Sequence, residues 1–240
     1  MPNFAFWLSL PLMLPQAMWI RRRTPRFRGP ADELCGVIGK APQQRIIGIG
    51  DSIIAGVGAR TPTETITAQL ALCWHEATGF DVAWEAFGRI GARSTRVGQM
   101  AESLAADDRV TVVLLSAGVN DITGLTRVAE WLGSIDRIID TLLEKYPAAI
   151  VVLLGIPPLD TFPALPSPLR EVLGSRARYF DRRARRHLEA RERCCYCPIE
   201  RRPAANEFAA DGFHPSVESY AALAAAIAEL VLQKTPENKN

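Results

Sequence analysis

The sequence predicts an α/β domain in which helices cover both faces of a parallel sheet. Short apolar segments rich in β-branched residues recur along the chain, and longer stretches with apolar residues at helical spacing lie between most of them. Residues 46–49 and 110–115 are continuous apolar runs, apart from one glycine and one threonine, as expected for strands buried on both sides of a parallel sheet. Strands and helices that alternate at these lengths specify this layered arrangement.

Composition limits the class of protein. A chain of 240 residues is long enough to bury a sizeable core in one domain, and its hydrophobic content of 48% is ordinary for globular proteins. The net charge of +2 is too small to indicate a nucleic-acid partner, so we expect none. Five cysteines form no disulfide framework of the small secreted kind, and Cys194, Cys195 and Cys197 lack a second Cys/His pair at zinc spacing. We expect reduced thiols and no metal site.

Residues 1–44 are predicted to precede the domain, as an apolar segment followed by a basic linker rich in proline and glycine. The apolar run, residues 4–20, is near the lower length limit for a membrane span and is interrupted by Pro11 and Pro15. Arginines follow this run instead of preceding it, which argues against a secretory signal. If the run inserts, the positive-inside rule keeps the domain cytoplasmic; otherwise it is an arm on the domain or at a membrane surface. We expect a cytoplasmic protein, with residues 4–20 as a candidate for membrane association.

The elements of the domain follow in order. The predicted strands cover residues 46–49, 81–87, 110–116, 149–154 and 195–199. The predicted helices cover residues 62–78, 97–104, 127–146, 169–192 and 217–232. Gly79 ends the first helix and Pro147 stops the third, which has the broadest apolar face. The arginines of helix 169–192 are predicted to form a solvated face, the alternative being contact with anionic headgroups.

Four short motifs contain the residue types that ester chemistry needs. They are Gly50-Asp51-Ser52, Gly88-Arg89-Ile90-Gly91, Gly118-Val119-Asn120-Asp121 and Asp211-Gly212-Phe213-His214, and the first three follow predicted strands. The carboxyl ends of parallel strands border the crevice where open α/β sheets bind ligands. A single serine at such a position would more simply be the cap of the next helix. Whether Ser52 is a cap or a nucleophile therefore depends on the other three motifs.

These four motifs, in this order, resemble those of the SGNH (GDSL-type) serine esterases and lipases, and the resemblance covers about residues 45–232. It implies a three-layer α/β/α flavodoxin-like sandwich with a five-stranded parallel sheet in the order 2-1-3-4-5. We expect a hydrolase domain over residues 45–233 and a polar tail over residues 234–240.

The motifs supply each role that a serine esterase requires. Ser52 is the candidate nucleophile, and His214 is the candidate base because a neutral imidazole titrates near working pH. Asp211 lies three residues earlier in a turn that Gly212 favours, so its carboxylate can reach the imidazole Nδ1–H. The family resemblance implies an oxyanion hole built from the N–H of Ser52, the N–H of Gly91 and the side chain of Asn120.

Some assignments have rivals. Gly88 is the rival to Gly91, and many relatives carry an asparagine where Ala86 stands. Asp51 and Asp121 are expected to brace loops as hydrogen-bond acceptors.

In the proline-rich loop 155–168, Phe162 and Leu165 are tentative substrate-binding residues. They are expected either to line an acyl pocket or to cover the edge of the core.

The predicted function is hydrolysis of a carboxylic ester through an acyl-serine intermediate, without metal or cofactor. Lipid-like or short acyl esters are the favoured small-molecule substrates, with lysophospholipase-like activity included. The alternatives are a carbohydrate O-acetylesterase, a transacylase, or a catalytically silent, membrane-associated binding module. Dinucleotide binding is excluded because Ile53 stands where the third glycine belongs, and the phosphate-binding Gly-Lys-Ser/Thr pattern is absent. Binding of FMN would leave His214 and Asn120 unexplained.

Overall fold

The computed structural model describes Gln16, residues 28–199 and residues 204–234. Apart from Gln16, the apolar segment 4–20 lies outside these residues, as does the polar tail beyond Lys234. Within the described ranges, no helix has both the length and the apolar character needed to cross a bilayer.

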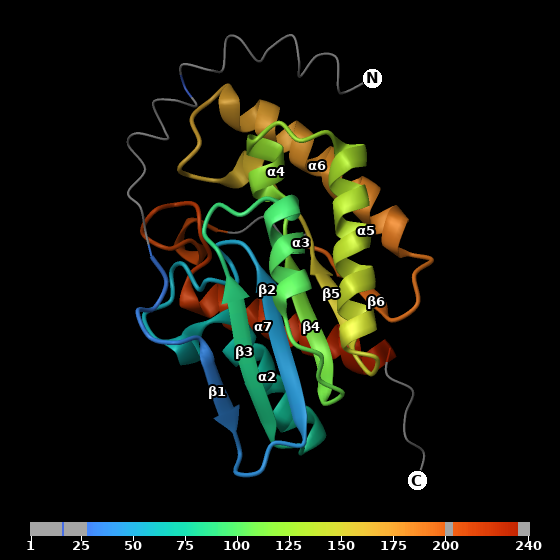
Figure 1. Ribbon diagram of the computed structural model, residues 1–240. Coiled ribbons are helices and arrows are strands. Elements are labelled where there is room, and N and C mark those ends of the chain that lie inside the picture. The colour runs from blue at the N-terminus through green and yellow to red at the C-terminus, as the bar shows by residue number, and fades with distance from the viewer. Residues whose placement is uncertain (1–15, 17–27, 200–203, 235–240) are drawn as a thin grey trace.

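One six-stranded sheet forms the centre of the domain, with helices on both faces (Figure 1). Its strands are β1 (Cys35–Ile38), β2 (Gln44–Gly50), β3 (Val82–Gly88), β4 (Val110–Ser116), β5 (Ile150–Leu154) and β6 (Cys194–Cys197). The order across the sheet is β1-β3-β2-β4-β5-β6, and β2 to β6 are parallel. The predicted fold class and the order of the five parallel strands are therefore confirmed.

The sixth strand corrects the predicted strand count of five. Residues 35–38, in the stretch predicted as a linker, pair antiparallel with β3, with Cys35 opposite Glu85 and Ile38 opposite Val82. Gly36 lies against the indole of Trp84, where an added Cβ would come within 2.8 Å of the ring nitrogen. A strand of four residues is too short to show a clear alternation of apolar and polar positions, so the sequence pattern did not reveal it.

The helices agree with the predicted pattern, with shifts at their ends. They are α2 (Ile66–Thr78), α3 (Ser94–Ser103), α4 (Val119–Thr123), α5 (Val128–Lys145), α6 (Leu169–Leu188) and α7 (Val217–Lys234), and the short 3₁₀ turns are η1 (Pro62–Glu64), η2 (Leu159–Thr161) and η3 (Ala205–Glu207). The segment predicted as one helix from Pro62 divides into η1 and α2. Gly79 ends α2 in the left-handed conformation, as the sequence predicts. Helix α4 was not predicted, because five residues are too few to show a helical period.

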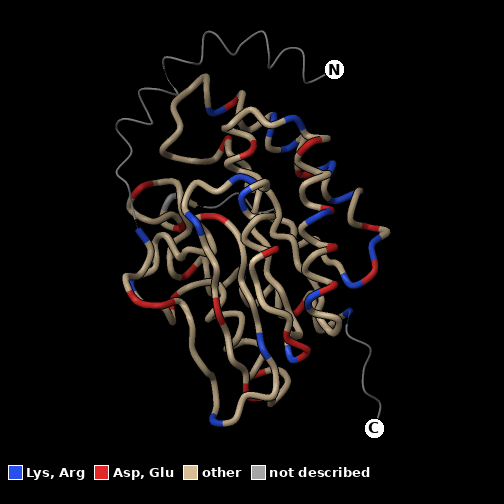
Figure 2. The backbone as a smooth tube through the Cα atoms, viewed as in Figure 1, with Lys and Arg blue, Asp and Glu red and all other residues tan. Residues whose placement is uncertain are grey.

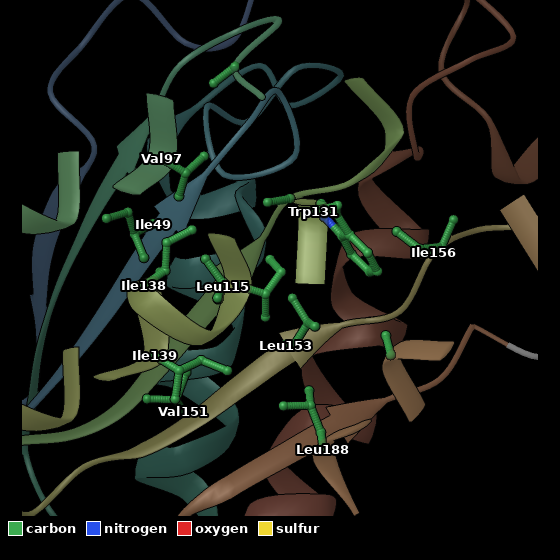
Figure 3. Packing of buried hydrophobic residues seen from close by; sticks show 14 of the residues in the cluster. Ile49, Val97, Leu115, Trp131, Ile138, Ile139, Val151, Leu153, Ile156 and Leu188 are labelled. Atoms are coloured by element: carbon green, nitrogen blue, oxygen red, sulfur yellow. The ribbon is translucent and has the colours of Figure 1, made fainter. Parts of the chain in front are cut away.

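Two apolar cores lie on opposite faces of the sheet. Alternate residues of β2 point in opposite directions, so that Ile47 and Ile49 join one core while Ile46 joins the other. Helices α3, α5 and α6 cover the first face, shown in Figure 3, and α2 and α7 cover the second. Trp131 of α5 is fully buried in the first core and packs against Phe180, with 5.0 Å between the two ring centroids. This double covering leaves the carboxyl ends of the strands as the edge where polar motifs can gather.

The basic residues of α6 mostly form a solvated face, interspersed with acidic residues (Figure 2). Arg178 pairs with Asp160 at 2.8 Å, while Arg182, Arg183 and Arg186 are exposed. Arg176 is the exception, because it is buried, lies over the ring of Phe180 and donates to the carbonyl of Thr126.

Candidate active site

The turn after β2 presents Ser52 at the carboxyl edge of the sheet. A Cβ at Gly50 would lie 2.2 Å from the carbonyl oxygen of Ser116, so only glycine allows the two strand ends to approach this closely. The N–H of Asp51 donates to that same carbonyl at 3.1 Å, and the carbonyl of Asp51 accepts from Ala55. The chain therefore turns tightly just after β2, and the Ser52 side chain stays partly exposed.

His214 lies between Ser52 and Asp211. Its Nε2 is 3.0 Å from the Oγ of Ser52, and its Nδ1 is 2.5 Å from the Oδ2 of Asp211. The second carboxylate oxygen of Asp211 accepts backbone N–H groups of Phe213 and His214, each at 2.9 Å. The turn 211–214 thus fixes the carboxylate and the imidazole together, and tertiary folding brings them to the serine.

The electrostatics of Asp211 favour its charged form. Burial alone raises its pKa, but hydrogen bonds from the His214 ring and from two backbone N–H groups outweigh burial and hold the pKa below its usual value. Asp211 therefore stays ionised at neutral pH. A carboxylate facing Nδ1 orients the imidazole so that Nε2 is free to accept the serine proton.

The two rival glycines have different surroundings. Gly88 is packed tightly, since an added Cβ would lie 2.0 Å from the backbone nitrogen of Ala55. Gly91 stands in an open turn with φ of +77°, and an added Cβ would meet nothing within 4 Å. Gly91 is therefore exposed and uncrowded whereas Gly88 is packed, although neither glycine is among the residues that line the cleft described below.

Asn120 lies in the first turn of α4, four residues after the end of β4. Its Nδ2 donates to the carbonyl of Ala92 at 3.0 Å, which ties it to the turn that contains Gly91. Asn120 also lines the cleft beside Ser52. Its amide carries two hydrogens, so one can hold the turn while the other is available to a ligand.

The two remaining carboxylates of the motifs are buried hydrogen-bond acceptors. Asp51 accepts from the hydroxyl of Ser116 at 2.9 Å and from the N–H of Ile53 at 3.1 Å. Burial raises the pKa of Asp51 to about 6, and these two hydrogen bonds only partly oppose the increase. Asp121 accepts two hydrogen bonds from Ser94, and burial raises its pKa as well.

A cleft of about 660 Å³ opens beside Ser52 and His214. Most of its walls are apolar, and they include Val119, Leu154, Ile156, Pro157, Phe162, Ile199, Phe208, Phe213 and Leu223. Phe162 is one of these lining residues. Its ring makes edge-to-face contacts with those of Phe208 and Phe213, with centroid separations of 5.2 Å and 5.0 Å. Leu165 is buried in the first core and is not among the lining residues. Both tentative substrate-binding residues are therefore buried in the first core, and of the two only Phe162 also lines the cleft.

Sequence reasoning missed Phe208, Phe213 and Ile156 as cleft residues. Phe213 lies inside the motif that contains Asp211 and His214, so its proximity to the site could have been inferred. Phe208 reaches the same place because the chain folds back on itself, through a bridge between Phe208 and Pro215. No local pattern reveals that contact.

The cysteines of β6 lie on two faces of the sheet. Cys194 belongs to the first core, whereas Cys195 and Cys197 belong to the second. Burial raises the pKa of all three thiols, that of Cys197 to about 11. No group of three or more His, Cys, Asp or Glu residues arranged to hold a metal ion occurs in the part of the chain that the structure describes.

Comparisons with known proteins found one matching family model and several similar solved structures. The model of the GDSL-like lipase/acylhydrolase family matches residues 49–222. Similar solved structures include a lipase from a goat rumen metagenome, which is 16% identical and has a TM-score of 0.64 over 78% of this chain and 97% of that chain. A family 3 carbohydrate esterase from Clostridium thermocellum is 15% identical, with a TM-score of 0.62 over 79% and 96%.

The lipase/acylhydrolase from Enterococcus faecalis is 19% identical, with a TM-score of 0.58 over 80% of this chain and 96% of that chain. A search of curated proteins found no match. At these identities the structural likeness establishes the fold.

Proposed function

The chain belongs to the GDSL-like lipase/acylhydrolase family, and from this membership we propose that it is a serine esterase that uses Ser52 as its nucleophile. The observation that supports this most directly is the arrangement in which His214 lies 3.0 Å from the Ser52 hydroxyl and faces Asp211 on its other side. A serine hydroxyl is a weak nucleophile by itself and needs an adjacent base that is held in place. Asp211, His214 and Ser52 meet that requirement.

In the proposed reaction, the Oγ of Ser52 attacks the ester carbonyl while His214 Nε2 takes the hydroxyl proton. The resulting imidazolium, stabilised by Asp211, then gives this proton to the leaving alcohol, and an acyl-Ser52 intermediate remains. Water, deprotonated by the same His214, attacks the acyl group and releases the acid. The bond between Oγ and the acyl carbon forms in the first half and breaks in the second, so the enzyme is regenerated.

The negative charge that develops on the carbonyl oxygen requires donors. We assign this role to the backbone N–H groups of Ser52 and Gly91 and to the Asn120 amide. Each such donor is typically worth about 3–4 kcal/mol of transition-state stabilisation. The open surroundings of Gly91 and the place of Asn120 in the cleft wall support the assignment.

The cleft favours an ester with an apolar acyl group. Its walls are mainly aliphatic and aromatic, and they begin directly beside Ser52. We therefore propose lipid-like or short acyl esters as substrates, with lysophospholipase-like activity among them. Solved structures of similar fold include both lipases and carbohydrate esterases, so an O-acetylated sugar or a second alcohol as acyl acceptor is the alternative.

We also propose that the apolar segment 4–20 associates with a membrane on the cytoplasmic side. The first described residues after it join the domain beside the site, because Gly29 and Pro30 pack against Ala55 and Gly56, which follow Ser52. Deletion of residues 1–27 should abolish co-sedimentation with phosphatidylglycerol vesicles and leave turnover of a soluble ester unchanged. Equal sedimentation of both proteins would overturn this part of the proposal.

The experiment that tests the esterase is covalent labelling. Wild type, Ser52→Ala and the matched control Ser103→Ala, whose exposed hydroxyl bonds only to the carbonyl of Met100 within its own helix, are incubated with a fluorophosphonate probe. We expect a single mass adduct on wild type and on the control, and none on Ser52→Ala. A folded wild type that neither labels nor hydrolyses p-nitrophenyl esters would instead support a catalytically silent binding module.

A further inference from the structure

The two proposed oxyanion donors outside the nucleophile turn belong to different segments of the chain. Gly91 lies in the turn between β3 and α3, whereas Asn120 is the second residue of α4, the short helix after β4. A misplacement of about 1 Å in a catalytic constellation costs on the order of 10²-fold in rate. The two segments must therefore be fixed relative to one another.

Asp121 makes that connection. Its Oδ2 accepts the backbone N–H of Ser94 at 2.9 Å, and its Oδ1 accepts the hydroxyl of Ser94 at 2.8 Å. Ser94 is the first residue of α3 and stands three residues after Gly91, while Asp121 directly follows Asn120. One carboxylate therefore holds the beginning of α3 through two bonds, next to both donors.

The connection replaces a local helix cap. Helix α3 has Arg93 at its N-cap, and this residue makes no side-chain cap hydrogen bond. The first N–H groups of a helix need an acceptor, and an anion is favoured there. Asp121 supplies it from another segment, so that formation of the α3 end depends on the placement of α4.

Both partners are shielded from solvent. Asp121 and Ser94 are 0% exposed, and neither is among the residues that line the cleft. A buried carboxylate is costly unless it is hydrogen-bonded, and the bonds from Ser94, together with one from the Thr126 side chain, meet that need. Asp121 has no access to substrate from there, so it acts on catalysis through the groups that it places and not by contact with substrate.

We propose that Asp121 is a positioning residue for the oxyanion hole, which sets Asn120 against Gly91 by capping α3 at Ser94. The inference rests on the proposed esterase function. The bond from Asn120 to Ala92 is a second link between the same two segments, and Asn120, unlike Asp121, lines the cleft.

The test compares Asp121→Asn and Ser94→Ala with Ser134→Ala. Ser134 is a buried serine on α5 whose hydroxyl donates to the carbonyl of Glu130 and accepts from Arg137, both in the same helix, and so provides a control for loss of a buried hydroxyl. With p-nitrophenyl butyrate, we expect Asp121→Asn to lower kcat by about 10²-fold and Ser94→Ala by about tenfold, with KM within threefold of wild type. Ser134→Ala should change only the thermal midpoint.

A double-mutant cycle with Asn120→Ala separates positioning from general destabilisation. If Asp121 acts through Asn120 and Gly91, Asp121→Asn should lower kcat by clearly less in the Asn120→Ala background than in wild type, because only the displacement of Gly91 can then still matter. If the effects of Asp121→Asn and Asn120→Ala on kcat simply multiply in the double variant, the inference is overturned. Wild-type kcat in both Asp121→Asn and Ser94→Ala would also overturn it. In either case an active, Ser52-dependent wild type would leave the esterase proposal standing. An inactive, unlabelled wild type would overturn both.

Discussion

The imidazole Nε2 of His214 lies 3.0 Å from the Oγ of Ser52, although 162 residues separate them in the sequence. Ser52 follows β2 at the centre of the sheet, and His214 precedes α7, which packs on the second face. Because α7 begins at Val217, its packing sets where the preceding turn can lie. The contact between nucleophile and base is therefore a product of the layered fold.

Replacement of Asp211 by asparagine should remove most of the activity. The amide cannot stabilise an imidazolium, and it favours the wrong tautomer of His214, as in other serine hydrolases. We expect kcat for p-nitrophenyl butyrate to fall by about 10⁴-fold with little change in KM. The backbone bonds to Oδ1 can be kept by the asparagine oxygen, so the thermal midpoint should move little. Retention of more than a tenth of wild-type kcat would contradict the assigned role.

Phe162 and Leu165 should respond differently to substitution. Phe162 lines the cleft, so Phe162→Leu should widen it and raise the ratio of kcat/KM for p-nitrophenyl octanoate to that for the acetate by about tenfold. Leu165 is packed in the core, and Leu165→Val should cost about 1 kcal/mol of unfolding free energy without changing this ratio. A change of chain-length preference in Leu165→Val alone would reverse the assignment.

The buried carboxyl of Asp51 should make the protein less stable as the pH rises. Its pKa in the folded state is about 6, above the value near 3.9 in an unfolded chain. Between these values the folded state binds more protons, so the unfolding free energy falls as the pH rises from about 4 to above 6. The loss amounts to about 3 kcal/mol as an order of magnitude.

Asp51→Asn removes this ionisation while it keeps an oxygen for Ser116 and Ile53. Denaturant unfolding of both proteins between pH 4 and pH 7.5 should show the stability of the variant rising relative to wild type as the pH increases. A difference that is independent of pH would show that Asp51 does not titrate in this range.

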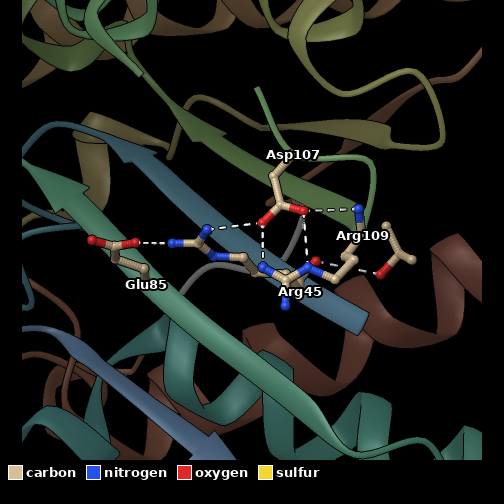
Figure 4. Close-up of polar contacts among 5 residues, drawn as sticks. Arg45, Glu85, Asp107 and Arg109 are labelled. Atoms are coloured by element: carbon tan, nitrogen blue, oxygen red, sulfur yellow. Dashed lines mark hydrogen bonds and ion pairs between the residues drawn. The ribbon is translucent and has the colours of Figure 1, made fainter. Parts of the chain in front are cut away.

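A network of ion pairs at the far end of the strands should contribute to stability and not to activity (Figure 4). Arg45 pairs with Glu85 and with Asp107, and Asp107 also pairs with Arg109. Hydrogen bonds from Arg109, then from Arg45, hold the pKa of Asp107 well below its ordinary value, although burial opposes them. A lowered pKa means that the stabilisation is present at neutral pH and is lost as the pH falls through the acidic range.

Asp107→Asn should therefore cost about 1 kcal/mol at pH 7, with a difference from wild type that shrinks toward pH 3. The rate with p-nitrophenyl butyrate should stay within twofold of wild type, because Arg45 lies near the start of β2, whereas Ser52 follows the other end of that strand. Unfolding titrations at three pH values and one kinetic assay check both statements. A large loss of activity with unchanged stability would contradict the prediction that these ion pairs contribute to stability and not to catalysis.

Much of the fold could be predicted from residues that are near one another in sequence. The long apolar face of α5 and the continuous apolar run of β4 are local periodic signals, and both elements appear where expected. Helix α4 and strand β1 could not be predicted, since each is too short to show a period. Strand β1 forms because β3 offers an unpaired edge and Trp84 covers Gly36.

The chemical groups available to this protein can be read from its residues alone: a serine after a buried strand, an asparagine after another, and a carboxylate three residues before a histidine. How these groups meet cannot, because the distances between Ser52 and His214 and between Asp121 and Ser94 depend on how helices pack on the sheet. The fold also distinguishes two apolar residues of one loop, because Phe162 and Leu165 are both buried in the first core but only Phe162 also lines the cleft. The physical reason is that hydrophobic periodicity records which residues are buried, whereas contacts between distant segments depend on which buried faces pack together.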